Sequence, residues 1–170
     1  ILKNNGIDPA ADLEIDQSID FGSTAAAFTG DASAAFTVEF EPSATALEKK
    51  GAGYVVASLG VDSGYVPYTS YSAKTSFLNE NPQVIQSFTT ALQKGMDYVQ
   101  SHTPEEIAQV IAPQFPETDL DTLTIIVTRY YEQDTWKDNL VFEQDSFELL
   151  QDILESAGEL SERVDYEQLV

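Results

Sequence analysis

Apolar residues at three- and four-residue spacing predict helices through the second half of the chain. A helix opening at Asn81-Pro82 would place Ile85, Phe88 and Leu92 on one face. Three further helices are predicted over 103–111, 118–131 and 145–158, each with a polar or proline residue suited to a helix start. The pattern and the caps agree, so this half is predicted to be helix-rich.

The first third instead predicts short strands that alternate with helices. Apolar or alternating runs over 12–19, 33–40 and 53–60 are typical of strands. A short alanine-rich helix is predicted between the first two, and one from Pro42 to a stop at Gly51 between the last two. Alternation with connections this short indicates an α/β fold with a parallel sheet.

Tyrosines recur at every third position after the last predicted strand. Tyr65, Tyr68 and Tyr71 flank a proline in a segment that favours an extended conformation. Such rings either stack on a flat ligand and hydrogen-bond to it, or pack under a neighbouring helix. For Tyr65 and Tyr68 both interpretations stand, whereas packing is favoured for Tyr71.

A strong negative charge narrows the range of partners. The chain has 170 residues with 29 acids against 8 bases, a formal net charge of −21. This balance disfavours nucleic acid and anionic lipid as partners. The 42% hydrophobic content is that of a folding chain, and no apolar run has the length of a membrane span.

Catalytic and metal chemistry find little support in the sequence. There is no cysteine. Asp8, Asp12, Asp16 and Asp20 recur every four residues, which does not fit a calcium loop, so they are interpreted as a solvated surface. Ser63 lacks the glycine pattern of a nucleophile elbow. The single histidine, His102, precedes a helix cap and is expected to favour the C-terminal dipole of the preceding helix. No catalytic residue, metal or cofactor is predicted.

Glu41 stands where a predicted strand meets a helix. The sequence there reads Phe40-Glu41-Pro42, with another acid at Glu39. Either Glu41 is an ordinary surface acid at a helix start, or the strand end lines a cleft in which a carboxylate meets a ligand.

The order of these segments resembles a family of ABC-transporter substrate-binding proteins, those for nitrate, sulfonates, taurine and thiamine-pyrimidine precursors. The likeness runs from "AAAFTGDASAAFTVEFEPSATALEKKGAGYVV" through "SGYVPYTSYSAK" and "NPQVIQSFTTAL" to "DSFELLQDIL", which is nearly the whole chain. Two positions depart from the family, which often has Trp where Phe40 stands and Asp where Ser33 stands.

The resemblance implies a two-lobed fold of the periplasmic-binding-protein type (type II), incomplete in this chain. Residues 1–64 would be the remainder of the second lobe, and 65–170 a crossover strand and helices that return to the first lobe. Phe40, Glu41, Tyr65, Tyr68 and Thr69 would bind the ligand between the lobes. The chain would act outside the cytoplasm, in the periplasm or anchored on the cell surface, and would deliver its ligand to a membrane permease.

Three alternatives accompany this resemblance. The ligand is expected to be a pyrimidine precursor, because arginines that could pair with an anion are scarce, with Arg129 and Arg163 the only two here. Sulfonate, taurine or nitrate stay open, because the missing lobe could supply an arginine. A sensor domain of the same fold is the second alternative. Pyrimidine-precursor synthases of this fold are implied to use pyridoxal phosphate and a cysteine-rich motif, which the chain lacks.

The opening "ILKNNGIDP" reads as the last turn of a helix that stops at Gly6. We therefore expect a C-terminal fragment whose strands lack neighbours. Unpaired strand edges invite pairing with another chain, so self-association is expected, with an exchanged segment hinged near Gly60–Gly64.

Overall fold

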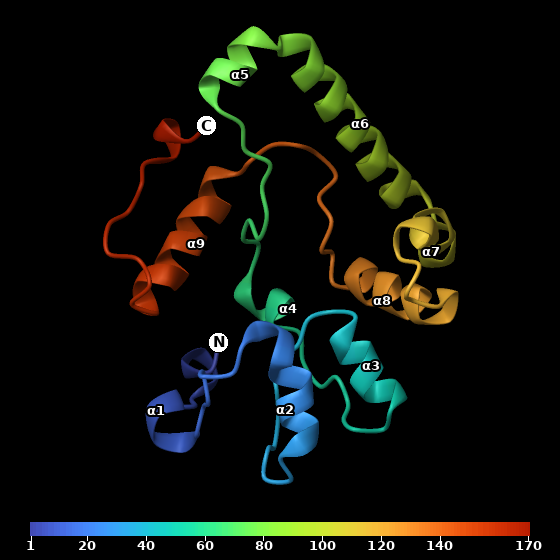
Figure 1. Cartoon of the computed structure of the whole chain (residues 1–170). Helices are drawn as coiled ribbons and strands as arrows, with labels where there is room; N and C mark the ends of the chain where they lie inside the picture. Colours follow the sequence, from blue (N-terminus) through green and yellow to red (C-terminus); the bar gives the residue numbers. More distant parts are fainter. The chain divides into compact units, whose positions relative to one another are not determined.

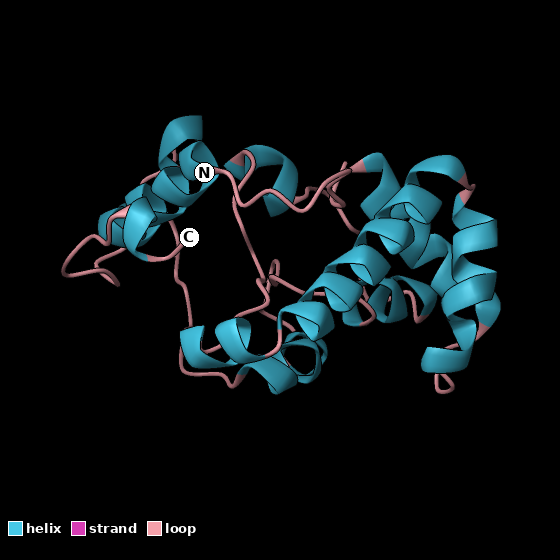
Figure 2. Ribbon diagram, turned by 90° about the horizontal axis from the view of Figure 1, so that it is seen from above, coloured by secondary structure: helices cyan, strands magenta, loops and turns pink.

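The computed structural model describes residues 1–170 and consists of helices and irregular segments without β-strands (Figures 1 and 2). The α-helices are α1 (Pro9–Asp12), α2 (Thr24–Gly30), α3 (Ser43–Lys49), α4 (Leu59–Ser63), α5 (Thr75–Glu80), α6 (Pro82–Ser101), α7 (Pro104–Ile111), α8 (Leu120–Glu132) and α9 (Gln144–Ser156). Short 3-10 helices are η1 (Lys3–Asn5), η2 (Phe21–Ser23), η3 (Ala112–Gln114) and η4 (Tyr166–Gln168). None of these helices combines the length and the apolar character needed to cross a membrane.

Two compact units divide the chain, and each is described by itself. Unit 1 comprises Ile1–Asp62 and Pro104–Gln133, and unit 2 comprises Ser63–Thr103 and Asp134–Val170. The lobes proposed over 1–64 and 65–170 stay a prediction.

Unit 1 is organised around helices α3, α7 and α8. Its buried apolar side chains are Leu47, Ile107, Ala108, Leu123, Ile126 and Val127. The helix predicted over 118–131 is therefore confirmed, with Leu123 and Val127 of α8 buried and Leu120 exposed. Helix α8 begins where the sequence predicts, because the Asp119 side chain accepts the Thr122 N–H at 2.9 Å.

Unit 2 holds a smaller buried cluster around α9. The ring of Phe147 lies 5.7 Å from that of Phe142 and 6.3 Å from that of Tyr166. Helix α9 begins at Gln144, one residue before the predicted range of 145–158, and no side chain caps it. Asp145 is therefore not the helix start expected from sequence, although the helix itself is confirmed.

Glycines end two of the predicted helices as expected. Gly51, which follows the C-cap of α3, has φ 68°, and Gly158, which follows that of α9, has φ 77°. Both conformations are left-handed, a region in which an L side chain is strained. Gly6 likewise ends η1, with its N–H on the Lys3 carbonyl.

The predicted strands over 12–19, 33–40 and 53–60, and the crossing strand from Tyr65, are wrong for this structure. These segments are irregular, and Leu59 and Gly60 belong to α4. Helix formation uses hydrogen bonds within one segment, whereas a strand exists only when a second segment pairs with it. None of these segments pairs with another, so the helix predictions survive and the strand predictions do not.

Apolar side chains of these unpaired segments remain in solvent. Val38 is 57% exposed, and Tyr54 and Val56 are each 88% exposed. The chain exposes 12817 Å² in total. Two separate compact domains of half its mass would expose about 10,000 Å² together. The structure therefore exposes more surface than two compact domains of this total mass would expose, and large apolar side chains contribute to it.

We expect the isolated 170-residue chain to self-associate through these segments at moderate salt. Apolar burial should outweigh surface repulsion, because salt screens the negative charge. Light scattering measures the mass. Lysine at Val38 and Val56 should shift the chain toward monomer, and Gln83→Lys on α6, which adds the same type of charge elsewhere, should not. A monodisperse wild-type monomer would contradict this expectation.

Candidate functional site

The residues predicted to bind a ligand are divided between the two units. Phe40 and Glu41 belong to unit 1, and Tyr65, Tyr68 and Thr69 belong to unit 2. The prediction that they share one concave surface stays a prediction, and the surroundings of each set are described separately.

Glu41 lies directly before α3 and is held by that helix. Its Oε2 accepts the Thr45 backbone N–H at 3.0 Å, and its Oε1 accepts the Thr45 hydroxyl at 2.9 Å. The Arg129 Nη1 also donates to Oε1 at 2.9 Å, and the Glu41 side chain is 9% exposed. Glu41 is thus not a solvated surface acid. It is an ion-paired carboxylate that satisfies the first turn of α3.

Arg129 of α8 contacts the residues at both ends of α3. Besides Glu41 it donates to the Thr45 hydroxyl at 2.8 Å and to the Glu48 carboxylate. Burial lowers the pKa of Arg129, but its hydrogen bonds to Glu41 and Glu48 outweigh burial, so the pKa is raised. The guanidinium stays charged, as two facing carboxylates require.

Glu48 in turn fixes the segment after α3. Its Oε1 accepts the Val55 backbone N–H at 2.8 Å, while its other oxygen pairs with Arg129. These bonds lower the pKa of Glu48, the Val55 N–H most of all. The carboxylate therefore accepts the backbone N–H of Val55, which no neighbouring strand accepts in this structure.

A second polar contact joins the C-terminal end of α3 to the N-terminal end of α8. The Lys49 ammonium donates to the Thr122 hydroxyl and lies 3.4 Å from Asp119 Oδ1. The Thr122 hydroxyl and N–H both bond to Asp119, and together with Lys49 they lower the pKa of Asp119 to about 2. Arg129 and Lys49 thus fasten α3 to α8 at two points.

Phe40 carries its ring against another aromatic ring of unit 1. The centroid of Phe21 lies 5.0 Å away at an interplanar angle of 52°, and Phe40 is 42% exposed. The ring is therefore packed in part.

Tyr65 and Tyr68 both reach solvent in unit 2, at 71% and 75% exposure. The Tyr65 hydroxyl donates to Asp134 Oδ2 at 2.5 Å. Thr69 is exposed as well. Tyr71 contacts Phe88 edge-on, with centroids 5.0 Å apart, yet it is 78% exposed, so the packing favoured for it from sequence is limited to this one ring contact.

His102 is engaged at the end of α6. Its ring stacks on Tyr98 with centroids 3.6 Å apart, and its Nδ1 lies 2.8 Å from the Tyr98 carbonyl oxygen. The expected place of His102 at the C-terminal end of a helix is confirmed. No group of three or more histidine, aspartate or glutamate side chains in the structure is arranged to hold a metal ion.

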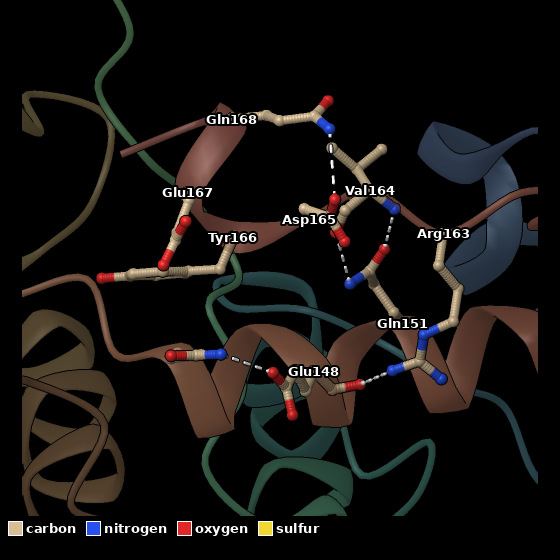
Figure 3. A pocket seen from close by; sticks show the side chains of 9 residues that line it. Glu148, Gln151, Arg163, Val164, Asp165, Tyr166, Glu167 and Gln168 are labelled. Atoms are coloured by element: carbon tan, nitrogen blue, oxygen red, sulfur yellow. Dashed lines mark hydrogen bonds between the residues drawn. The ribbon is translucent and has the colours of Figure 1, made fainter.

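A groove of about 680 Å³ lies between α9 and the C-terminal segment, and sequence reasoning did not find it (Figure 3). Its lining residues are Gln144, Glu148, Gln151, Arg163, Val164, Asp165, Tyr166, Glu167 and Gln168. Gln151 is buried and clamps Val164, donating to its carbonyl at 3.1 Å and accepting its N–H at 2.7 Å. Arg163 pairs with Asp152 and Glu155 of α9. These contacts fasten the C-terminal segment to the helix, which gives the groove a structural role.

Sequence reasoning did not predict Arg129 as the partner of Glu41 or Asp134 as the partner of Tyr65. Only two arginines occur in the chain, and one of them pairs with Glu41. An arginine in a strongly acidic chain is a signal for such a pair, but its partner is 88 residues away in the sequence. Asp134 carried no pattern of its own.

Comparison with known proteins adds a family to this geometry. A family model described as NMT1/THI5 like matches residues 1–107. A protein of Bacillus subtilis (strain 168) named "Putative binding protein YtlA" is 37% identical over 170 residues, 100% of this chain. The match covers 51% of that relative, so the chain spans about half its length. No solved structure matches the chain.

Arg129→Met should destabilise unit 1 by about 2–3 kcal/mol, below the full cost of breaking a buried pair because the guanidinium keeps some solvent contact. The substitution leaves two carboxylates without their cation. Urea unfolding followed by circular dichroism measures the change. Arg163→Met is the matched control, since it removes exposed pairs and should have a much smaller effect. Equal effects of the two substitutions would show that the part-buried pairs of Arg129 contribute no more stability than the exposed pairs of Arg163.

Asp119 should make α8 sensitive to acid. A carboxyl whose pKa is lowered from 3.8 to about 2 in the folded chain stabilises it above pH 3.8, and this contribution is lost as the pH falls toward 2. Asp119→Asn keeps a capping side chain without the charge. The free energy of unfolding should therefore fall less steeply between pH 4 and pH 2 in the variant than in the wild type. Parallel curves would refute the lowered pKa.

Proposed function

Because the chain belongs to the NMT1/THI5-like family, we propose that it is part of the solute-binding component of an ABC importer. The match of a family model to residues 1–107, together with a whole-chain likeness to a protein named a binding protein, carries this proposal. In it the chain contributes to a two-lobed fold of type II, captures a small molecule outside the cytoplasm and delivers it to a membrane permease.

The proposed ligand site uses Phe40, Glu41, Tyr65, Tyr68 and Thr69. Two observations support it within the separate units. Phe40 leaves part of its ring exposed, and the rings of Tyr65 and Tyr68 are largely open to solvent. Aromatic faces of this kind stack on planar ligands. Closure of two lobes over such a ligand would bury it and create the form that docks on the permease.

The charge around Glu41 favours a ligand other than an oxyanion. Arg129 supplies one positive charge, but Glu41 and Glu48 supply two negative charges, and three of the Arg129 hydrogen bonds go to Glu41, Thr45 and Glu48. An anion placed there would meet a net negative charge, which is unfavourable at partly buried sites. A pyrimidine precursor is therefore the favoured ligand over sulfonate, taurine or nitrate.

A sensor domain of the same family would use the same ligand site and differ only in its partner. The name of the relative, a binding protein, fits both roles. The proposal also holds that the ligand is released unchanged. Mass spectrometry of the ligand recovered from the purified full-length protein checks this, and a converted product would return the enzyme alternative.

The full-length protein should be stabilised by 4-aminopyrimidine and less by taurine or nitrate. A ligand that binds only the native state raises the melting temperature, which a thermal-shift assay measures. Glu41→Gln should weaken binding by roughly 1–3 kcal/mol, because it removes a charged acceptor. Glu39→Gln, the same change two residues earlier, is the control. Stabilisation by taurine or nitrate alone would contradict the ligand preference, and equal affinity of the two variants would exclude Glu41 from the site.

A further inference from the structure

The Tyr65 hydroxyl has a fixed partner far away in the sequence. It donates its proton to Asp134 Oδ2 at 2.5 Å, across 69 residues. This distance falls in the short range of hydrogen bonds from a hydroxyl to a carboxylate, about 2.5–2.7 Å. Both residues belong to unit 2, so the contact lies inside one compact body.

Asp134 is held in place by its own backbone and by its loop. Its φ of 52° lies in the left-handed region, and no other residue except glycines has a positive φ in this structure. Aspartate and asparagine tolerate that region better than most residues. The loop that follows is tied to α6, where Gln93 donates to the Asp138 carbonyl at 2.9 Å and Gln100 to the Trp136 carbonyl at 3.3 Å. The carboxylate therefore faces Tyr65 from a fixed position.

This pair decides what Tyr65 offers to a ligand. A phenol has one proton to donate and lone pairs with which to accept. Once the proton is given to Asp134, the Tyr65 oxygen can only accept. The residue is 71% exposed, so much of Tyr65 is open to a ligand while its hydroxyl proton is engaged by Asp134.

We propose that Asp134 is a positioning residue that makes Tyr65 an acceptor and so selects ligands that carry N–H donors over ligands that only accept. This inference rests on the proposed function, because it assumes that Tyr65 meets the ligand. Nitrate and the oxygens of a sulfonate present acceptors only, whereas an aminopyrimidine presents an N–H at the edge of a flat ring. Glu41, a carboxylate paired with Arg129, would make the same demand on a ligand.

The hydrogen bond can be tested without any ligand. In the full-length protein with ring-¹³C tyrosine, NMR titration should show Tyr65 losing its proton at a higher pH in the wild type than in Asp134→Asn. The bond to Asp134 and its negative charge raise the pKa of Tyr65. Asparagine keeps the left-handed backbone, Tyr65→Phe assigns the signal, and Asp138→Asn in the same loop is the control. Equal titration in the wild type and Asp134→Asn would overturn the proposal.

The selection is tested with two probes that share a ring and differ in one donor. The wild type should prefer 4-aminopyrimidine over 4-(dimethylamino)pyrimidine. Asp134→Gly removes the acceptor and tolerates the left-handed backbone, and it and Tyr65→Phe should each reduce this preference roughly tenfold, about the value of one lost hydrogen bond. A merely structural role would weaken both probes alike and leave their ratio unchanged, which would overturn the proposal. Failure of both probes to bind the wild type would contradict the ligand selection and the proposed function together. If the Tyr65 titration were nevertheless shifted as expected, the hydrogen bond would stand and the fault would lie in the proposed function alone.

Discussion

The packing of α3 on α8 in unit 1 depends on the hydrogen bonds and ion pairs of the Arg129 guanidinium. One side chain of α8 reaches Glu41 before α3, Thr45 in its first turn and Glu48 near its end. Charges removed from water are stable only when they are paired and hydrogen-bonded. The three groups meet this condition together, so the place of α3 on α8, the capping of α3 and the course of the chain at Val55 have a common origin. Lys49 adds a second attachment at the other end of α8.

Whether a part of the fold follows from sequence depends on whether its hydrogen-bond partners lie nearby in the chain. The helices over 82–101, 104–111, 120–132 and 144–156 were predictable because periodic apolar residues and end residues are local signals. Strand pairing is not local, since a segment such as 33–40 has the composition of a strand but needs a neighbour that the sequence does not identify. In this chain that neighbour is absent, and the apolar residues of the segment lie exposed instead of in a sheet.

The candidate site was predictable to a similar degree. Residue type and spacing drew attention to Phe40, Glu41, Tyr65 and Tyr68. What each group can do depends on a partner that lies 88 residues away for Glu41 and 69 residues away for Tyr65. No periodicity connects residues at such distances, so sequence alone left Glu41 between a surface acid and a ligand contact. The structure removes the first of these interpretations, because the carboxylate is nearly buried and ion-paired.

The two partners have opposite chemical effects that lead to the same ligand class. Arg129 donates a hydrogen bond to Glu41, whose ion-paired carboxylate can only accept further bonds. Asp134 takes the one donor that Tyr65 has, which leaves a phenol oxygen that also only accepts. One residue gains donors and the other loses one, yet both present acceptors. A ligand that met either of them would have to bring its own N–H groups, since an acceptor facing an acceptor loses its bond to water and gains nothing in exchange. The carboxylates of this acidic chain thus affect which hydrogen bonds a ligand can form, in addition to giving the chain its negative charge.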